Sequence, residues 1–424
     1  MLVCSLARKR FCGAIVDRID QVHLQGRVNL QDILLISTAD WDNPFWTNKQ
    51  HMAALFNKRG YRVLYLDSLG LRRPTLHKRD LKRIVKRLVK ALPTVHEVRP
   101  NLWRISPLVL PFHSISMVRS FDAALLRAQV KYYLARIGMP RPLIWTYNPV
   151  IVELCSKIPN SGIVYHCVDD LGACPRIDPA TIQKAEAKLG NIAQLCFATS
   201  PILYERMAPL FPRVIYEPNV CDQAFFETAR LKPAEPAELT KIPHPRLLFV
   251  GALSEYKINY DLMETIARDM PEQHWILIGP EGEGQPDSRR PPVGANIHML
   301  GPRTYGHLPY FMAHCEMAVL PIARNNYTDA MFPMKFFEFL AAGLPVICTR
   351  IPALKEFESL YFPCDTPEDF QAAITDVLNG ARRDQEEIDA ACHHHSWEAR
   401  FTRMEKILEE VFPQTIRNET TSHV

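Results

Sequence analysis

Short segments dominated by apolar residues alternate along the chain with segments whose apolar residues recur at helical spacing. Residues 33–37 and 61–67 are of the first kind, and residues 48–59 between them have helical spacing and end at Gly60. A strand that is apolar along its whole length is typical of a parallel sheet covered on both faces. The three segments therefore predict a β-α-β unit of a doubly wound sheet. No G-x-G-x-x-G follows the first strand, which counts against an ordinary dinucleotide site.

The same alternation runs through two halves of the chain. In the first half it predicts strands at 143–146, 162–166 and 195–199 and helices at 121–137 and 179–191. Proline and polar residues then concentrate between 217 and 245, which indicates a linker. In the second half the pattern predicts strands at 246–251, 274–279 and 317–321 and helices at 258–270 and 397–411. Two successive doubly wound units create a cleft between the carboxyl ends of two sheets, which is the usual position of a ligand.

Composition narrows the class of protein. Hydrophobic residues make up 47% of the 424 residues and charged residues 23%, which is the range of soluble globular proteins. A net charge of only +4 gives no case for nucleic-acid binding. The eleven cysteines include no C-x-x-C pair, which indicates reduced thiols in a cytoplasmic protein.

The segment 333–349 predicts a helix that starts near Pro333 and ends at Gly343, followed by a short apolar strand. Lys335 and Glu338 are three residues apart, so both project from one face of its first turns. A helix N-terminus attracts anions, and Lys335 adds a positive charge there. Glu338 can accept hydrogen bonds from the two hydroxyls of a ribose, so the pair suits a nucleoside diphosphate. The alternative is an amphipathic helix with a solvated lysine and glutamate.

Two acidic sites follow strands of the first half. Asp169 and Asp170 come after the apolar segment 162–166, so they should lie in the cleft, where a carboxylate can act as a general base. Equally, either could cap a helix or a turn. Asp40, Trp41 and Asp42 follow the first strand and could hold an acceptor sugar by stacking and hydrogen bonds, although the aromatic ring could also be a buried anchor of the loop.

At these residues the chain resembles the GT-B glycosyltransferases that use nucleotide sugars to build bacterial polysaccharides. The resemblance covers about residues 31–415. Four motifs carry it, at residues 251–257, 296–309, 333–338 and 395–398. It implies an α/β fold of two Rossmann-like doubly wound domains that face a cleft. It also implies that the donor is bound by Gly251, Lys257, Arg303, Met334, Lys335 and Glu338.

The resemblance implies a division into an N-terminal extension 1–30, an acceptor-binding domain 31–220, a linker 221–245, a nucleotide-sugar-binding domain 246–392 and a helix 393–415 that crosses back. The expected activity is transfer from a nucleotide-diphosphate sugar, with a UDP-sugar favoured, to a glycan or lipid-linked acceptor. Such an enzyme needs no cofactor. Lys257 and Lys335 can stabilise the diphosphate, and Asp169-Asp170 is not D-x-D, so we expect no essential metal.

The chain departs from the family at one position. Many retaining members carry two glutamates separated by seven positions, but the residue that precedes Glu338 at this spacing is Ala330. The Met334-Lys335 pair and the paired aspartates look more like xanthan-type glucuronosyltransferases and teichuronic-acid-type enzymes. Two other functions stay open at this point, a nucleotide-sugar epimerase of similar fold and a catalytically silent nucleotide-binding subunit of a polysaccharide assembly machine.

Residues 77–92 combine apolar positions at helical spacing with lysine and arginine at most other positions. The pattern predicts a helix that binds an anionic membrane surface, where a lipid-linked acceptor would be found, on the inner face of the cell membrane. The alternative is an ordinary helix of the domain with a solvated basic face.

Overall fold

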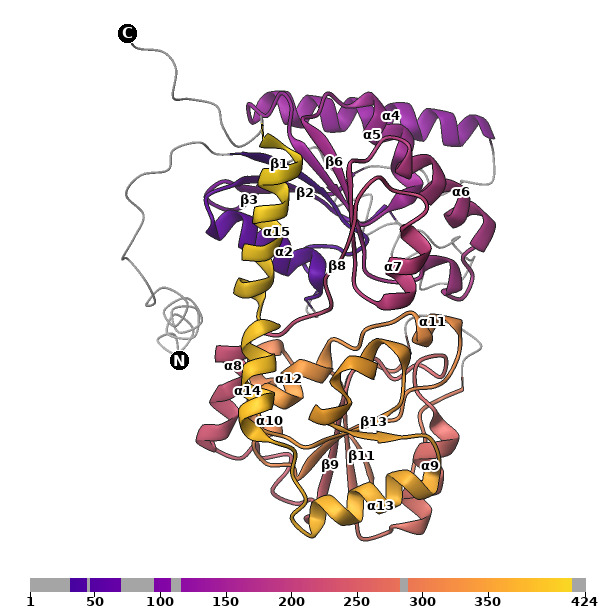
Figure 1. Ribbon diagram of the computed structural model, residues 1–424, viewed down its shortest axis with the longest axis vertical. Helices are drawn as coiled ribbons and strands as arrows, with labels where there is room; N and C mark the ends of the chain where they lie inside the picture. The colour runs from indigo at the N-terminus through magenta and orange to yellow at the C-terminus, as the bar shows by residue number, and fades with distance from the viewer. Residues whose placement is uncertain (1–30, 44–45, 70–94, 108–115, 283–288, 414–424) are drawn as a thin grey trace, which may run out of the picture.

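The computed structural model describes residues 31–43, 46–69, 95–107, 116–282 and 289–413. Two α/β domains lie one above the other, and the long C-terminal helix α15 (Trp397–Val411) runs from the lower domain up along the side of the upper one (Figure 1). The upper domain contains the N-terminal half of the chain.

The N-terminal domain is built on one eight-stranded sheet with the order β3-β4-β2-β1-β5-β6-β7-β8. Its strands are β1 (Asp32–Ile36), β2 (Arg62–Leu66), β3 (His96–Arg99), β4 (Leu102–Ile105), β5 (Leu143–Thr146), β6 (Gly162–Cys167), β7 (Leu195–Ala198) and β8 (Val214–Tyr216). β3 pairs with β4 in the antiparallel sense, and the other neighbouring strands pair in parallel. Its helices are α2 (Asn48–Lys58), α4 (Ser116–Arg136), η1 (Pro149–Ile151), α5 (Val152–Lys157), η2 (Leu171–Ala173), α6 (Pro179–Gly190) and α7 (Pro201–Met207).

The C-terminal domain has a six-stranded sheet with the order β11-β10-β9-β12-β13-β14, in which neighbouring strands pair in parallel. The strands are β9 (Arg246–Val250), β10 (His274–Ile278), β11 (Ile297–Met299), β12 (Met317–Leu320), β13 (Val346–Thr349) and β14 (Phe362–Cys364). The helices are α8 (Gln223–Glu227), η3 (Thr228–Leu231), α9 (Tyr260–Asp269), η4 (Tyr305–His307), α10 (Leu308–Met312), α11 (Asn326–Asp329), α12 (Lys335–Ala341), η5 (Pro352–Leu360), α13 (Pro367–Leu378) and α14 (Gln385–His394).

The N-terminal sheet has a hydrophobic core on each face because its central strands are apolar at nearly every position. In β1, Ile33 and Leu35 point to one face, and Leu34 and Ile36 point to the other. The face with Ile33 is covered in part by α15, whose residues Trp397, Phe401, Met404 and Leu408 belong to that core together with Phe412, which follows the helix. The last helix of the chain is therefore an integral part of the N-terminal domain.

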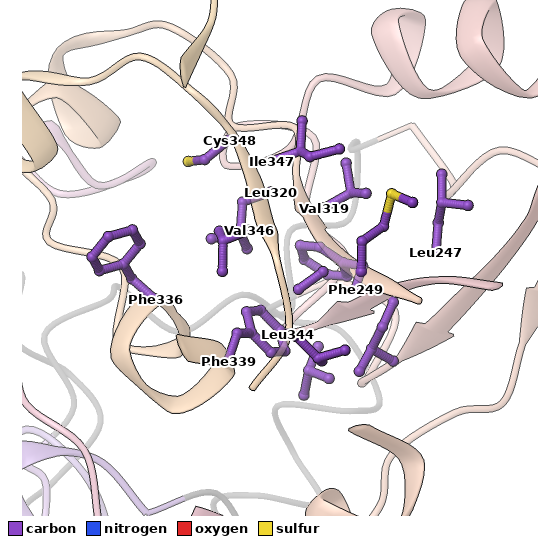
Figure 2. Close-up of a cluster of buried hydrophobic side chains, with 14 of the residues drawn as sticks. Leu247, Phe249, Val319, Leu320, Phe336, Phe339, Leu344, Val346, Ile347 and Cys348 are labelled. Carbon is purple, nitrogen blue, oxygen red and sulfur yellow. The ribbon is translucent and has the colours of Figure 1, made fainter. Parts of the chain in front are cut away.

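The C-terminal core fixes the position of α12. Phe336 and Phe339 are fully buried and belong to the same hydrophobic core as side chains of β9, β12 and β13 (Figure 2). Gly343 follows the end of the helix with a φ of +82°, a conformation that favours glycine. These aromatic anchors hold the first turn of α12, with Lys335, at the boundary between the domains.

The predicted strands and most predicted helices are found at or within a few residues of the expected positions. The strands β3, β4, β8 and β14 were not predicted. The residues of β3 are largely exposed and carry no apolar run, and β4, β8 and β14 are only three or four residues long. Among the helices of the described residues, none combines the length and apolar character that a membrane span requires.

Candidate functional site

Two chain segments cross between the domains, and they lie side by side. Cys221 in the first segment donates its N–H to the carbonyl of His395 in the second at 3.0 Å. Trp397 in turn donates to the carbonyl of Cys221 at 3.1 Å. The joint between the domains is therefore a short two-stranded connection next to the N-terminus of α15.

A buried polar network secures this joint. The guanidinium of Arg400 on α15 is fully buried and donates to Asn48 Oδ1 at 2.8 Å, to the carbonyl of Glu217 at 3.1 Å and to His166 Nε2 at 2.9 Å. Asn48 also donates to Asn219 Oδ1 at 2.9 Å. Each contact is a charge-assisted or buried hydrogen bond, so the network should stabilise the joint strongly.

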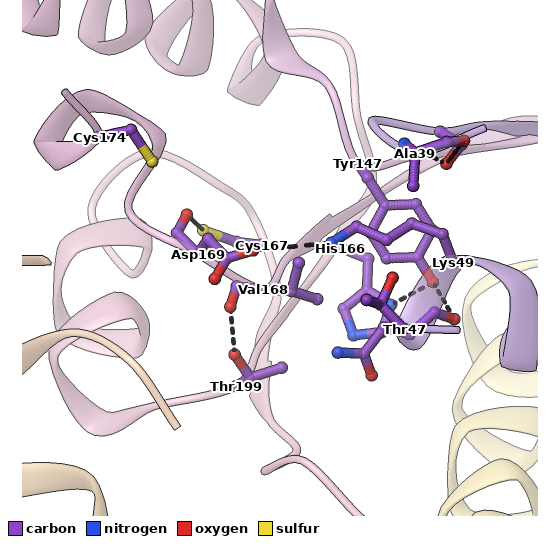
Figure 3. Close-up of polar contacts among 12 residues, drawn as sticks. Ala39, Thr47, Lys49, Tyr147, His166, Cys167, Val168, Asp169, Cys174 and Thr199 are labelled. Carbon is purple, nitrogen blue, oxygen red and sulfur yellow. Dashed lines mark hydrogen bonds and ion pairs between the residues drawn. The ribbon is translucent and has the colours of Figure 1, made fainter. Parts of the chain in front are cut away.

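His166 belongs to this network and has a structural role. Because a guanidinium can only donate, His166 Nε2 must accept from Arg400, and the ring proton then lies on Nδ1, 3.1 Å from the hydroxyl oxygen of Tyr147 (Figure 3). Burial, and secondarily the charge of Arg400, holds the pKa of His166 well below its usual value. The imidazole is therefore neutral and saturated with hydrogen bonds, which makes it unsuitable as a general base.

The predicted donor pair forms an ion pair at the start of α12. Lys335 Nζ lies 2.5 Å from Glu338 Oε2, and Glu338 is only 2% exposed. Burial raises the pKa of Glu338 above its usual value, although the charge of Lys335 opposes the shift. Lys335 Nζ also lies 5.5 Å from the centre of the Tyr305 ring.

His51 on α2 brings the N-terminal domain close to this pair. His51 stacks on Trp397 with ring centres 4.6 Å apart and lies 5.8 Å from the ring of Tyr305. Burial, together with the nearby charge of Lys335, lowers the pKa of His51 to about 3. Lys335 therefore faces the opposite domain, as a ligand site in the cleft requires.

The second predicted lysine lies at the carboxyl end of the C-terminal sheet. Gly251 follows β9, and Gly279 follows β10. A Cβ atom added at Gly279 would lie only 1.8 Å from the carbonyl oxygen of Gly251, so the two turns are in close contact. Lys257 follows the first turn, and its Nζ lies 5.3 Å from the ring centres of both Tyr256 and Tyr327. Cation–π contacts of this kind hold a lysine amine without neutralising it.

The two adjacent aspartates have different environments. Asp170 caps η2, accepting from the N–H groups of Gly172 at 3.0 Å and Ala173 at 3.2 Å, and its Oδ2 lies 2.6 Å from Arg206 Nη1. Asp169 instead faces the C-terminal domain, where the hydroxyl of Tyr327 donates to its Oδ1 at 3.1 Å. The structure thus gives Asp170 the capping position that the sequence left open as an alternative.

Lys49 completes the surroundings of Asp169. Its Nζ lies 3.6 Å from Asp169 Oδ2, and the residue is only 7% exposed (Figure 3). Thr47 begins α2 with a capping box to Gln50, which fixes the first turn of the helix and hence the position of Lys49. α2 therefore supplies a positively charged partner to Asp169 from within the N-terminal domain.

The predicted acceptor residues do not converge on this cluster. Trp41 is 7% exposed and packs against Trp46 and Tyr65 with ring centres 5.2 Å apart, so it is an anchor of its loop. Asp42 forms an ion pair with Arg104. Asp40 is half-buried, and its carbonyl accepts from the Gln50 side chain at 3.0 Å.

Two predicted donor residues make structural contacts. Arg303 Nη2 lies 3.4 Å from Glu238 Oε1, and the guanidinium carbon lies 5.7 Å from the ring centre of Phe311. Met334 precedes α12 and packs against the core of the N-terminal domain. Met334 is thus placed at the domain boundary, next to Lys335.

The structure therefore gathers part of the predicted set. The pair Lys335–Glu338 lies at the boundary between the domains, and Asp169 contacts Tyr327, which lies beside Lys257. The side chains with local structural contacts instead are those of Asp170, Trp41, Asp42 and Arg303. Lys49, His51, Tyr305 and Tyr327 were missed. A single lysine or tyrosine on a short helix carries no pattern that distinguishes it from a surface residue.

The predictions of a membrane-binding segment and of an N-terminal extension are not tested by the structure. The basic segment 77–92 and the extension 1–30 lie outside the described residues. Within the part of the chain that the structure describes, no group of three or more histidine, cysteine, aspartate or glutamate side chains is arranged to hold a metal ion.

Solved structures share this two-domain arrangement. Sucrose-phosphate synthase from Thermosynechococcus elongatus superposes with a TM-score of 0.64 at 17% identity and covers 91% of this chain and 100% of its own. Anabaena HepE in complex with UDP-glucose has a TM-score of 0.63 at 15% identity, covering 89% of this chain and 99% of its own. The chain has the GT-B fold. The fold expected from the sequence is thus confirmed.

Sequence comparisons point the same way. Residues 244–380 match the family model of Glycosyl transferases group 1. The putative teichuronic acid biosynthesis glycosyltransferase TuaH of Bacillus subtilis strain 168 is 27% identical over 165 residues, which is 37% of this chain and 41% of the relative. The match therefore spans less than half the length of that curated relative. The resemblance to glycosyltransferases, read from the sequence motifs, is confirmed.

Proposed function

We propose that this protein is a glycosyltransferase that moves a sugar from a nucleoside-diphosphate sugar, with a UDP-sugar favoured, to a glycan or lipid-linked acceptor in polysaccharide biosynthesis. The family match on residues 244–380 supports the reaction class. The choice of a polysaccharide is supported by the teichuronic acid relative, and the choice of uridine by HepE, which was solved with UDP and with UDP-glucose.

The observation that carries this conclusion is the Lys335–Glu338 ion pair at the domain boundary. A diphosphate would attract the Lys335 amine away from Glu338, because it offers more negative charge than one carboxylate. Glu338 is buried, so its oxygens would then need new hydrogen-bond donors, and the two hydroxyls of a ribose can supply them. One substrate would thus satisfy both members of the pair at once.

Lys257 offers a second positive charge to the diphosphate. Its amine lies against the rings of Tyr256 and Tyr327 at the carboxyl end of the C-terminal sheet. Two amines can stabilise the negative charge that develops on the leaving diphosphate, a role that calls for no metal ion. Transfer that persists after treatment with EDTA would agree with this arrangement.

Asp169 is the group best placed to act as general base. It comes from the domain opposite the donor residues, and its carboxylate has charged and hydrogen-bonding partners that hold it in place. In the proposed step an acceptor hydroxyl attacks the anomeric carbon and loses its proton to Asp169. The bond from that carbon to the diphosphate oxygen breaks, and the nucleoside diphosphate leaves.

The acceptor is proposed to be held at the membrane surface. The basic segment 77–92 provides the positive charge that an anionic lipid surface attracts, and a lipid-linked saccharide would be presented there. The protein would then act as a peripheral protein on the inner face of the cell membrane.

The test is a thermal-shift screen of nucleoside diphosphates, followed by mass spectrometry of the products formed from UDP-sugars with and without lipid-linked saccharides. We expect UDP to raise the melting temperature most, and a mass increase of one sugar to appear only on the acceptor. Interconversion of UDP-sugars without an acceptor would instead identify an epimerase. Stabilisation by UDP with no product would identify a binding subunit.

A further inference from the structure

One tyrosine lies between the candidate base and the candidate phosphate-binding lysine. The hydroxyl of Tyr327 donates to Asp169 Oδ1 at 3.1 Å, across the domain boundary. The centre of its ring lies 5.3 Å from Lys257 Nζ. Tyr327 is only 6% exposed, so both contacts are made in a largely dehydrated setting, where polar contacts are stronger than in water.

The turn that carries Tyr327 is fastened to the lysine loop. The side chain of Asn325 accepts from the N–H of Tyr327 at 3.0 Å and donates to the carbonyl of Tyr256 at 2.7 Å. The carbonyl of Lys257 accepts from Ala323 N–H at 2.9 Å. A displacement of the lysine loop by a bound phosphate would therefore be passed to the Tyr327 hydroxyl.

The same turn also docks on the N-terminal domain. Ser200, at the start of α7, donates its hydroxyl to the carbonyl of Ala330 at 2.7 Å, and Ala330 belongs to the hydrophobic core of that domain. Asn219 donates to the carbonyl of Phe332 at 2.7 Å. The segment from Asn325 to Phe332 thus connects the lysine loop with the domain that holds Asp169.

We propose that Tyr327 is a positioning residue that couples the donor phosphate site to the base Asp169, an inference that rests on the function proposed above. The Tyr327 hydroxyl donates to one carboxylate oxygen of Asp169, and Lys49 lies nearest the other oxygen. The two contacts together set the orientation in which Asp169 meets the acceptor. Since Tyr327 belongs to the donor-binding domain, the base is completed only when the two domains are together. The charged groups around Asp169 and Tyr327 are Lys49 on α2, Lys257 beside the Tyr327 ring, and Asp170, which follows Asp169 in the chain and pairs with Arg206 on α7.

The experiment compares two variants of Tyr327 in the full-length protein. Tyr327→Phe keeps the ring beside Lys257 and removes only the hydroxyl, whereas Tyr327→Leu removes both. Tyr204→Phe is the matched control, because Tyr204 lies on α7 and is 38% exposed. Affinity for UDP is measured by calorimetry. The substrate is the UDP-sugar that the parent protein uses fastest. The kcat and KM for the release of UDP from it are measured at pH values from about 5 to about 9.

We expect Tyr327→Phe to bind UDP within about twofold of the parent and to lose about tenfold or more in kcat, with KM little changed. The acidic limb of its pH profile should move to higher pH, since a hydrogen bond donated to a carboxylate favours the charged form. Tyr327→Leu should show the same loss and also weaker UDP binding. Tyr204→Phe should match the parent.

A double-mutant cycle separates positioning from a general structural effect. In an Asp169→Asn background, Tyr327→Phe should lower the residual rate no further, because the hydroxyl acts through that carboxylate. Parent-like kcat and pH profile in Tyr327→Phe, or full additivity with Asp169→Asn, would overturn the inference while the glycosyltransferase assignment stands. A parent protein that neither binds UDP nor releases it from any UDP-sugar would overturn both.

Discussion

Arg206 holds Asp170 in an ion pair, with Arg206 Nη1 2.6 Å from Asp170 Oδ2. The same carboxylate caps η2 through two backbone N–H groups. Its neighbour Asp169 has turned toward the other domain and meets Tyr327. Two adjacent and chemically identical residues therefore have separable roles, one in the stability of the N-terminal domain and one in the chemistry of the cleft.

The two aspartates should respond differently to the same substitution. Asp169→Asn is expected to lower kcat at least about a hundredfold while UDP affinity stays within about twofold, since the amide cannot accept the acceptor proton. Asp170→Asn is expected to lower the free energy of unfolding by about 1–3 kcal/mol, because the neutral amide cannot replace the carboxylate that lies 2.6 Å from Arg206, which then keeps only Glu186 at 3.3 Å. Chemical denaturation and steady-state kinetics on both variants provide the measurement. Near-parent turnover in Asp169→Asn would move the base elsewhere in the cleft.

The residue at position 330 bears on the stereochemistry of transfer. Ala330 is 1% exposed and packs into the core of the N-terminal domain, so this position supplies no carboxylate to the cleft. With Asp169 as base, attack takes place in one displacement, and we expect the anomeric configuration of the product to be opposite to that of the donor. Proton NMR of the product decides this. Retention of configuration would contradict the role given to Asp169.

Stability should fall as the pH is lowered from neutral, and His51 should contribute. Its pKa is about 3 in the folded protein, mainly through burial, against an ordinary value of 6.5. The unfolded chain therefore binds the proton first, and folded-state stability is lost as the pH falls below about 6.5. Between about pH 7 and pH 5 the loss due to His51 should be about 2 kcal/mol.

The measurement is the free energy of unfolding as a function of pH in the parent and in His51→Phe. Phenylalanine preserves an aromatic ring beside Trp397 and cannot titrate. The variant should therefore show a shallower pH dependence, with His166 and His395 still contributing because their pKa values are also lowered by burial. Identical slopes for the two proteins would show that His51 does not sense the pH.

The fold was largely predictable from the sequence, because the signals that mark its strands and helices lie within short segments of the chain. The strands of both sheets are covered on two faces, so nearly every position in segments such as 33–36 is apolar. The start and end of α12 were marked by Pro333 and Gly343, whose backbone preferences depend little on tertiary structure. In contrast, β3 is an exposed edge strand, and its sequence carries no comparable signal.

The candidate site was only partly predictable, because its contacts join distant parts of the chain. Tyr327 and Asp169 are 158 residues apart, and the sequence around neither residue indicates that the two side chains are in contact. The sequence placed Lys335 and Glu338 correctly on one face of a helix because their spacing alone determines this. Trp41 was ambiguous for a physical reason, since an aromatic ring suits both a sugar and the interior of a loop.

The membrane prediction concerns the basic segment 77–92. Replacement of Lys82, Arg83, Lys86 and Arg87 by glutamine should release the protein from anionic vesicles at low salt, since each basic residue near such a surface contributes about 1 kcal/mol. UDP affinity should be unchanged, which is the control for folding. Co-sedimentation at low and high salt gives the answer. Parent protein that stays in the supernatant at low salt would mean that these residues form an ordinary solvated surface.

The most direct test of the donor site compares UDP with uridine in the parent and in Lys335→Ala, by calorimetric titration. We expect the parent to bind UDP much more tightly than uridine, because Lys335 contacts the diphosphate. In Lys335→Ala the affinity for UDP should fall by about 1.5–3 kcal/mol, while the affinity for uridine changes little. Equal binding of UDP by the variant and the parent would contradict the assignment of the cleft as a nucleotide-sugar site.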